Sequence, residues 1–415
     1  MRGMNSGCVD LIYLDPPFNS NTNYAAPIGS KAAGAEFKDT WTLDDIDEEW
    51  IDLIAEKKEN RKLYRVLMSA MTDSDKSYLV YMSVRLLEMK RILKPNGTIY
   101  LHCDPTMSHY LKLVMDAIFG RGNFRNEVIW HYGKMSNSSK NFPANHDVIL
   151  RYSKTDDYKF NPIKEADSEY RNRFKNFLDA YNRITWGAVK HKTDKLVTLR
   201  AKKIQKELGR ELEDPDVLFD FDKEFKIQSD VIYCSIIKGN SKEKLDYPTQ
   251  KPQALLEKII MASSNPGDVV FDPFCGCATT LATADLLNRN WVGIDISPEA
   301  ARLIKIRIED QQGLWKDIIV RNDNPKRTDL GKLPPPRTHF KVLYGEQLGK
   351  CNGCKRKIDD EFMEVDHIVA KAKGGTDDID NLQILCRTCN QLKRTGSMEQ
   401  LKLKLKKLEM FEEAA

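Results

Sequence analysis

Two apolar segments that each end in an acidic residue constrain this chain more than any other feature. Residues 11–18 read LIYLDPPF, and residues 269–280 read VVFDPFCGCATT. A short, continuous apolar run is typical of a strand buried on both faces of a parallel sheet. Each run would therefore deliver its carboxylate, Asp15 or Asp272, to the carboxyl edge of the sheet, where open α/β sheets bind ligands. Two such strand ends hold two ligands side by side, as a group-transfer reaction requires.

The surrounding sequence alternates between strand and helix patterns. Apolar runs predict strands over 8–15, 98–103, 126–132, 147–152, 268–271 and 291–294. Of these, the strands over 126–132 and 147–152 are expected to pair as a hairpin. Helical spacing of apolar residues predicts helices over 78–93, 110–119, 252–263, 279–287, 298–311 and 399–413. Residues 19–50 have the composition of a loop, which we expect to lie over the site.

Size and composition narrow the class of protein. A chain of 415 residues predicts more than one domain. The formal net charge of +4 is small, so the distribution of charge, rather than its sum, must indicate any polyanionic partner. No apolar run reaches the length of a membrane span and no signal-peptide core is visible, so we expect a soluble cytoplasmic protein of bacterial, archaeal or phage origin. In that compartment the nine cysteines predict buried thiols or metal ligands rather than disulfides.

Changes in composition suggest the domain boundaries. The expected parts are a catalytic half over 1–153, an insertion over 154–245, a cofactor half over 246–320, a proline-rich linker over 321–339, a small domain over 340–396 and a C-terminal helix over 397–415. The insertion is rich in lysine and arginine with interleaved aromatic residues, which favours contact with a polyanion. A solvated helical surface explains the same composition, so this interpretation stays open.

The downstream segment has the features of a nucleoside site. Residues 272–276 lie between a strand and a helix, where Gly276 lets the backbone turn closely around a ligand that faces the helix N-terminus. Asp295 ends the next strand, and an acid at that position accepts hydrogen bonds from ribose hydroxyls. The pattern therefore predicts a cofactor that contains a nucleoside. Classical NAD binding fits less well because a GxGxxG motif is absent.

The upstream segment suits an amino group. Two consecutive prolines fix the backbone, so the Pro16 carbonyl points rigidly into the site. Asp15 and that carbonyl can accept hydrogen bonds from one exocyclic amine, and Phe18 offers a face on which a base stacks. A nucleobase must leave the duplex to reach such a pocket. Taken alone, the same residues also fit a tight Asp-Pro-Pro turn.

Both segments resemble motifs of the amino-methylating DNA methyltransferases that use S-adenosylmethionine. Residues 15–18 are similar to their catalytic DPPY/F motif, 272–280 to their DPFxGxGTT cofactor motif, and 247–252 (YPTQKP) to the segment that covers the methionine end of the cofactor. A catalytic motif that precedes the cofactor motif is the order of the β group. The resemblance implies methylation of adenine N6 in double-stranded DNA, with catalytic residues Asp15, Pro16, Pro17 and Phe18 and cofactor-binding residues Lys251, Asp272, Phe274, Gly276, Thr279 and Asp295.

The chain departs from the family pattern at two points. Cys277 and Ala278 replace the usual Gly/Ser-Gly pair, which predicts modest crowding of the cofactor turn. Relatives carry a longer segment before the catalytic strand than residues 1–8, so we expect either that the start of this sequence is truncated or that cofactor binding is weakened. Cytosine N4 remains an alternative target, because the hydrogen bonds accept either amine. A methyltransferase half that only recognises DNA for a nuclease is a second alternative. A glutamine methyltransferase of the release-factor type is disfavoured, because that class has Asn before Pro-Pro.

The last quarter of the chain contains a second constellation. Two CxxC pairs have the spacing of a tetrahedral zinc site, whose ligands would be Cys351, Cys354, Cys386 and Cys389. Between the pairs, Asp366 and His367 suggest hydrolysis, with a hard oxygen ligand beside a base for water. Lys371, Lys373, Lys393 and Arg394 are interpreted as surface residues that can meet phosphates.

This second pattern resembles the HNH, or ββα-metal, nucleases. The resemblance implies that His367 is the general base, that Asn381 braces the loop, and that Asp366 and Asn390 bind Mg²⁺ or another divalent metal. The combined expectation is an α/β chain. It has a Rossmann-like S-adenosylmethionine-dependent methyltransferase sheet with an inserted target-recognition region, and a small zinc-stabilised HNH domain. The expected partner is double-stranded DNA and not a membrane, and the sequence leaves open whether two copies form a homodimer.

Overall fold

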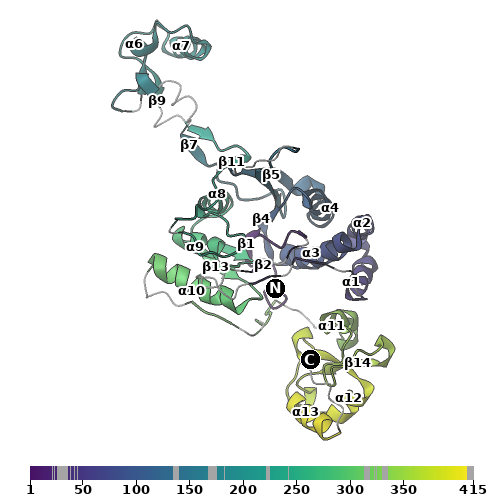
Figure 1. Cartoon of the computed structure of the whole chain (residues 1–415). Coiled ribbons are helices and arrows are strands. Elements are labelled where there is room, and N and C mark those ends of the chain that lie inside the picture. Colours follow the sequence, from purple (N-terminus) through teal and green to yellow (C-terminus); the bar gives the residue numbers. More distant parts are fainter. Residues whose placement is uncertain are drawn as a thin grey trace. The chain divides into compact units, whose positions relative to one another are not determined.

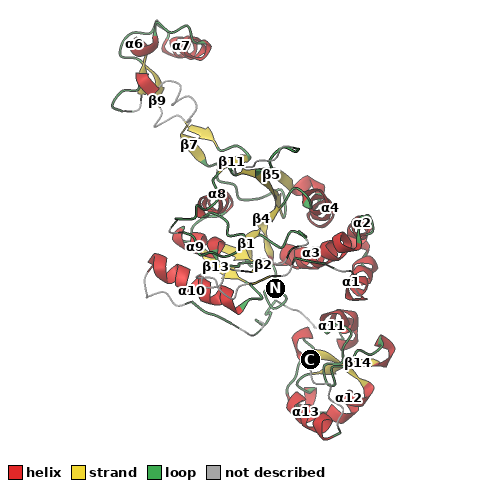
Figure 2. Cartoon of the chain, in the orientation of Figure 1, coloured by secondary structure: helices red, strands yellow, loops and turns green. Residues whose placement is uncertain are grey.

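A computed structural model of the chain is shown in Figure 1 and, coloured by secondary structure, in Figure 2. It describes residues 1–20, 22, 24–25, 36–37, 39–41, 43, 45–133, 140–166, 175–181, 183–220, 225–241, 243–312, 318–321, 323, 325–329 and 335–408. The chain divides into two compact units. One comprises Met1–Lys159 with Cys234–Ala415, and the other comprises Phe160–Tyr233.

A mixed sheet forms the centre of the first unit and confirms the predicted α/β class. Its strands lie in the order β5-β6-β4-β1-β12-β13. Their bounds are β1 Val9–Leu14, β4 Leu93–Cys103, β5 Phe124–His131, β6 His146–Ser153, β12 Val269–Asp272 and β13 Asn290–Gly293. The neighbouring strands from β4 to β13 are parallel, whereas β6 runs antiparallel to both β4 and β5. Strand β1 is buried along its whole length, as its continuous apolar run predicts.

Helices cover both faces of this sheet (Figures 1 and 2). One layer consists of α8 (Gln253–Ser263), α9 (Thr279–Leu286) and α10 (Pro298–Gln312). The opposite layer consists of α1 (Asp45–Glu56), α2 (Arg61–Leu67), α3 (Asp73–Ile92) and α4 (Ser108–Phe119). A short antiparallel pair joins β2 (Tyr24–Ala25) to β3 (Glu36–Phe37). No helix in the described ranges is both long and apolar enough to cross a membrane.

The helix boundaries follow from local chemistry. The sequence predicted a helix from residue 78, but α3 begins at Asp73 because the Thr72 side chain caps it by accepting a hydrogen bond from the Asp75 N–H. Likewise, α1 begins at Asp45, inside the segment predicted as a loop. Strand β4 begins at Leu93, directly after α3, whereas residue 98 was predicted.

The second unit is small and lies within the predicted insertion. It contains β7 (Lys164–Ala166), β8 (Arg183–Thr185), α6 (Trp186–Val189), α7 (Lys195–Leu208), β9 (Val217–Asp220), β10 (Phe225–Ile227) and β11 (Val231–Tyr233). Strand β8 pairs with β9, and β7 pairs with β10. Ile184, Val197, Leu218 and Phe219 belong to its own apolar core, so α7 buries one face, and its exposed side chains include several lysines as well as Leu199 and Leu208.

The C-terminal segment forms a two-stranded antiparallel sheet framed by short helices. Its elements are α11 (Phe340–Glu346), β14 (Met363–His367), β15 (Leu382–Cys386), α12 (Arg387–Lys393) and α13 (Met398–Lys407). A capping box, in which Ser397 and Gln400 exchange hydrogen bonds, starts α13. The predicted C-terminal helix is therefore present up to Lys407, and its last residues lie outside the described part of the chain.

Candidate functional site

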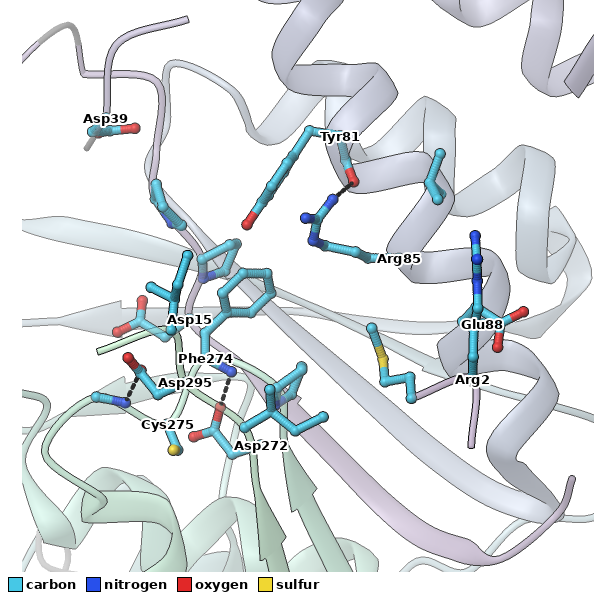
Figure 3. Close-up of a pocket in the computed structure, with 18 of the residues that line it drawn as sticks. Arg2, Asp15, Asp39, Tyr81, Arg85, Glu88, Asp272, Phe274, Cys275 and Asp295 are labelled. Carbon is cyan, nitrogen blue, oxygen red and sulfur yellow. Dashed lines mark hydrogen bonds between the residues drawn. The ribbon is translucent and has the colours of Figure 1, made fainter. Parts of the chain in front are cut away.

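The two strand ends meet in one pocket. Pairing of Leu11 with Val270 and of Ile12 with Phe271 makes β1 and β12 neighbours, so Asp15 and Asp272 follow at the same edge of the sheet. Figure 3 shows Asp15, Asp272, Phe274 and Asp295 gathered around this pocket. The pocket is lined by all the residues that the sequence predicted for the methyltransferase half, namely Asp15, Pro16, Pro17, Phe18, Lys251, Asp272, Phe274, Gly276, Thr279 and Asp295.

Asp15 presents one engaged and one unengaged carboxylate oxygen. Its Oδ2 accepts a hydrogen bond of 2.6 Å from the Lys251 ammonium, which is itself buried. Its Oδ1 is buried and has no hydrogen-bond partner among the described residues. A buried carboxylate oxygen without a partner is costly, and a ligand donor would satisfy it. The same ammonium lies 5.2 Å from the centroid of the Phe18 ring, so Lys251 fixes both ends of the motif.

A second acid, Asp39, holds the backbone that follows the motif. Its two oxygens accept hydrogen bonds from the N–H groups of Phe18 (3.2 Å), Asn19 (2.7 Å) and Ser20 (2.9 Å). The Ser20 hydroxyl and the Trp41 indole also donate to it. Because successive N–H groups converge on one carboxylate that is 1% exposed, the turn after the prolines is rigid. Sequence reasoning missed Asp39, which lies in the polar stretch 19–50 without a motif around it.

Two acidic residues, Asp272 and Asp295, accept hydrogen bonds from backbone N–H groups of the cofactor turn. Asp272 Oδ1 accepts from the Phe274 N–H at 3.0 Å, and Asp295 accepts from the N–H groups of Gly276 and Ser297, both at 2.8 Å. Each oxygen of Asp295 takes one backbone bond and keeps a second lone pair that can meet a ligand hydroxyl. Asp295 therefore shapes the turn as well as bordering the pocket.

Two backbone positions in this turn are left-handed. Gly276 has φ +46°, a backbone conformation that other residues rarely adopt, and a Cβ there would lie 3.0 Å from the Tyr247 ring, which would have to shift. Ala278, at the N-cap of α9, has φ 60° and ψ 30°. A left-handed residue other than glycine costs about 1–2 kcal/mol. The structure thus shows backbone strain at Ala278, whereas the crowding of the turn stays a prediction.

Arg307 of α10 stabilises the strained turn. Its buried guanidinium donates to the Cys277 carbonyl at 3.0 Å and to the Thr279 hydroxyl at 2.6 Å. These two acceptors belong to the residues on either side of Ala278, so α10 stabilises the turn through the side chain of Arg307. Sequence reasoning missed Arg307 because a single basic residue in a helix pattern carries no local signal.

Asp272 is the most perturbed acid of the site. The pKa of Asp272 is raised from 3.8 to about 7, chiefly because the carboxyl is completely buried; hydrogen bonds from Thr280 and the Phe274 N–H oppose this rise, and the negative charges of Asp15 and Asp295 add to it. Near neutral pH this carboxyl is therefore partly protonated. A cationic ligand nearby would favour its ionised form.

The raised pKa of Asp272 predicts a pH dependence of stability. Between about pH 4 and pH 7 the folded protein holds a proton that the unfolded chain releases, so the free energy of unfolding should fall as pH rises through this window. Asp272→Asn should remove this contribution. Urea titrations of both proteins at about pH 5 and about pH 7.5 measure the difference. Equal changes in the two proteins would contradict the assignment.

The four cysteines of the C-terminal segment form a compact cluster. Their sulfur atoms all lie within 4.8 Å of one another, and all four residues are buried. The Cys386 N–H donates to Cys351 Sγ at 3.2 Å, and the Cys389 N–H donates to Cys386 Sγ at 3.5 Å. A Cβ on Gly353 would lie 2.9 Å from Cys389 Sγ, so the first CxxC turn requires a glycine. Four thiols in this arrangement fit a structural Zn²⁺ ion.

The residues predicted for hydrolysis lie on neighbouring elements. Asp366 and His367 end β14, Asn381 lies before β15 and Asn390 lies on α12. Asn381 accepts from the Val369 N–H at 2.9 Å and donates to the carbonyls of Val369 and Thr376, so it ties the intervening loop together.

The candidate base and metal ligands have partners of their own. His367 Nε2 lies 2.8 Å from Asp377 Oδ1, and the Asn390 amide donates to Glu364 at 2.7 Å. Asp366 Oδ2 accepts from Gln383 and pairs with Lys393, both at 2.9 Å. Since both bonds fall on Oδ2, the other carboxylate oxygen of Asp366 and the amide oxygen of Asn390 are the atoms that a divalent ion would meet.

The structure corrects the interpretation of Lys393 as a surface residue. Its side chain is buried, and its ammonium donates to the His367 carbonyl at 2.7 Å as well as pairing with Asp366. A buried ammonium needs such partners. The position on α12 faces β14, which a run of basic residues in the sequence does not reveal. Lys373, by contrast, is exposed as expected.

Comparison with known families agrees with this geometry. A family model described as DNA methylase, of the N6/N4 type, matches residues 9–306, and a model described as HNH endonuclease matches residues 351–396. The chain belongs to the DNA methylase family. It carries in addition an HNH endonuclease domain.

Individual relatives include two curated bacterial enzymes. The type II methyltransferase M.EcaI of Enterobacter cloacae is 31% identical over 305 residues, which cover 62% of this chain and 63% of that protein. The DNA adenine methyltransferase YhdJ of Escherichia coli (strain K12) is 26% identical over 313 residues, which cover 71% of this chain and 74% of that protein. The first three relatives are covered over less than two thirds of their length. Among solved structures, the M1.HpyAVI–SAM complex aligns with TM-score 0.37 and 17% identity over 74% of this chain and 90% of that chain.

Proposed function

We propose that this chain methylates adenine at N6 in double-stranded DNA, using S-adenosylmethionine, and that its HNH domain cleaves DNA. The observation that carries the proposal is the environment of Asp15. One oxygen of Asp15 accepts a hydrogen bond from Lys251, and the other is buried and has no hydrogen-bond partner among the described residues, so it can accept from a ligand. An exocyclic amino group is a donor of the right kind, because one N–H can point to Asp15 and the other to the Pro16 carbonyl.

The chemistry then depends chiefly on position. The cofactor supplies an electrophilic methyl group when it is bound. Asp15 and the rigid Pro16–Pro17 backbone orient the amine, and the loop held by Asp39 keeps Phe18 in place for the extruded base. Because β1 and β12 are adjacent, the amine and the cofactor turn face the same pocket.

The cofactor-binding residues fit S-adenosylmethionine on structural grounds. The left-handed turn at Gly276 packs closely against the Tyr247 ring, and both residues line the pocket. The helix α9 starts at this turn, and its first two residues, Thr279 and Thr280, line the pocket, so its N-terminus suits an anionic or polar ligand group. The second lone pairs of Asp295 suit ribose hydroxyls. A positive sulfonium bound near Asp272 would favour the ionised form of its carboxyl, whose pKa is otherwise raised.

Adenine is the target base that we propose, on the basis of one relative and of the catalytic motif. A relative over 71% of this chain is named a DNA adenine methyltransferase, and the Asp of the motif resembles the adenine-specific pattern. Cytosine N4 is the alternative, since its amine offers the same two donors. Identification of the modified base in methylated DNA distinguishes the two.

The unit 160–233 is the proposed region of target recognition. Its helix α7 presents Lys202, Lys203 and Lys206 as exposed side chains, while Val197 and Ala201 lie in the unit's own core. A helix with a buried apolar face and an exposed row of cations suits contact with phosphates.

A second candidate function is that of a nuclease whose methyltransferase half only recognises DNA. The strained Ala278 at the cofactor turn favours it, because strain at this turn can weaken cofactor binding. Calorimetric titration with S-adenosylmethionine separates the two functions. Stoichiometric binding supports the transferase, and absence of binding supports the recognition role.

Asp15→Ala should abolish methylation while leaving cofactor binding intact. The variant removes the acceptor that orients the amine, so we expect the rate of methyl transfer to fall by at least about 100-fold. Transfer of radiolabelled methyl groups to DNA measures the rate, and calorimetry measures cofactor affinity. The exposed Asp157→Ala is the matched control and should retain full activity. Undiminished transfer by the Asp15 variant would refute its proposed role.

We propose that one structural Zn²⁺ ion is bound by four ligands, Cys351, Cys354, Cys386 and Cys389. Structural zinc in small domains stabilises the fold by about 10–16 kcal/mol. Cys354→Ser should therefore reduce bound zinc to well below one ion per chain and unfold the C-terminal segment at a lower temperature, with methylation retained. Atomic emission and calorimetry measure these effects. Cys234→Ser, outside the cluster, is the control and should keep its zinc. Full zinc content in the Cys354 variant would exclude this site.

His367 is the proposed general base of the nuclease, with Asp366 and Asn390 binding a divalent metal and Asn381 holding the loop. His367→Ala should lower Mg²⁺-dependent nicking of plasmid DNA by at least about 100-fold, because it removes the side chain proposed to activate water. Methylation should not change. The exposed His191→Ala removes the same group in the other unit and should leave nicking unaffected. Equal nicking by the His367 variant and the native protein would show that another residue is the base.

A further inference from the structure

Four polar side chains form a continuous row of hydrogen bonds beneath the catalytic motif. The Tyr132 hydroxyl donates to Asp147 Oδ1 at 3.1 Å, and Asp147 Oδ2 lies 3.0 Å from His102 Nε2. The other ring nitrogen, His102 Nδ1, lies 2.8 Å from the Tyr13 hydroxyl. His102 is 0% exposed and Tyr13 is 1% exposed, so the centre of the row is closed to water.

The row crosses adjacent strands at one edge of the sheet. Tyr13 lies near the end of β1, His102 near the end of β4, Asp147 near the start of antiparallel β6, and Tyr132 directly after β5. These strands are neighbours in the order β5-β6-β4-β1. The row therefore lies at the carboxyl edge of the parallel strands, where Asp15 and the pocket also lie.

The bonds fix the orientation of the His102 ring. Burial alone would raise the pKa of Asp147, but the hydrogen bonds from His102 and Tyr132 and the charge of Lys251 lower it, so this carboxylate is ionised at neutral pH. An ionised carboxylate can only accept, so Nε2 carries the proton. In a neutral imidazole, Nδ1 is then the acceptor for the Tyr13 hydroxyl. Each polar atom of the ring has one partner, and the ring cannot flip without losing both.

The fixed ring lies against the aromatic residue of the motif. His102 and Phe18 are stacked, with ring centroids 5.8 Å apart and planes inclined by 23°. Trp130 meets His102 edge-on, with centroids 5.7 Å apart and planes inclined by 81°. Phe18 is thus held at its backbone by Asp39 and at its ring by His102.

We propose that His102, locked by Tyr13 and Asp147, is a positioning residue that sets the plane of the Phe18 ring for stacking of the target base. The inference rests on the proposed methyltransferase function, and it names the support on which base stacking in that function depends. A base that stacks on Phe18 extends the layer begun by His102, so a tilt of the His102 ring would tilt the base and move its amine away from Asp15. A misplacement of about 1 Å can cost 100-fold in rate.

A purely structural row makes a different prediction. Buried hydrogen bonds that serve only stability can be removed with a loss of stability and no change in chemistry. The sheet offers a matched pair for this comparison. Tyr13 and Tyr100 are register partners on β1 and β4, and both are buried. The Tyr13 hydroxyl bonds to His102 and the Tyr100 hydroxyl to Ser263, with Arg151 as a further partner of Tyr100.

The test compares Tyr13→Phe with Tyr100→Phe in the full chain. Both variants should lose thermal stability to a similar extent. Only Tyr13→Phe should lower the single-turnover rate of methyl transfer, by about tenfold or more, with unchanged affinity for S-adenosylmethionine. Tyr100→Phe should stay within about twofold of the native rate. Equal rates for the two variants would overturn the inference, whereas an inactive native protein would overturn the proposed function itself.

A spectroscopic measurement addresses the ring directly. Nitrogen-15 NMR of the native protein should show a His102 signal with a protonated Nε2 and an Nδ1 that accepts a hydrogen bond, and Tyr13→Phe should shift the Nδ1 signal. A second variant, His102→Phe, keeps an aromatic ring but loses both hydrogen bonds, and it should lower the transfer rate to a similar extent as Tyr13→Phe. A native rate in His102→Phe would show that the hydrogen bonds do not position Phe18, and would overturn the inference.

Discussion

The parallel pairing of β1 with β12 is the interaction on which the rest of the structure depends. Leu11 and Ile12 pair with Val270 and Phe271, two buried apolar segments that exclude water from both faces. This pairing brings Asp15 and Asp272 to one edge and forces two acids into a shared, poorly solvated pocket. Burial there raises the pKa of Asp272, to which the charge of Asp15 adds, and Asp15 is paired with the buried ammonium of Lys251. The sheet thus creates the electrostatic conditions of the site as well as its shape.

Much of the sheet could be predicted, because continuous apolar runs have few other solutions. The strands over 8–15, 268–271 and 291–294 and the hairpin at 126–152 are present with small shifts at their ends. The residues of the two motifs were found by the same signal, an apolar run that ends in an acid and a turn. Boundaries were less certain where a side chain decides them, as when Thr72 caps α3 ahead of its apolar pattern.

Supporting residues could not be found in this way, because their role depends on partners that are distant in sequence. Asp39 is a loop acid until the fold brings it under the N–H groups of residues 18–20. Lys393 is one lysine among several until α12 packs its stem against β14. His102 is the instructive case. It lies at a strand end on the carboxyl edge, so the argument that selected Asp15 would have selected His102 as well.

The order of the strands also determines when the site can exist. Strand β1 leaves the ribosome first, but its partner β12 follows only after the hairpin, the unit 160–233 and α8 have been made. At about 5–20 residues per second, β1 lacks one of its neighbours for on the order of ten seconds or more. The nascent chain therefore has its acceptor motif long before its cofactor turn. The pocket that both strand ends line therefore cannot form until β12 and the turn that follows it have been made.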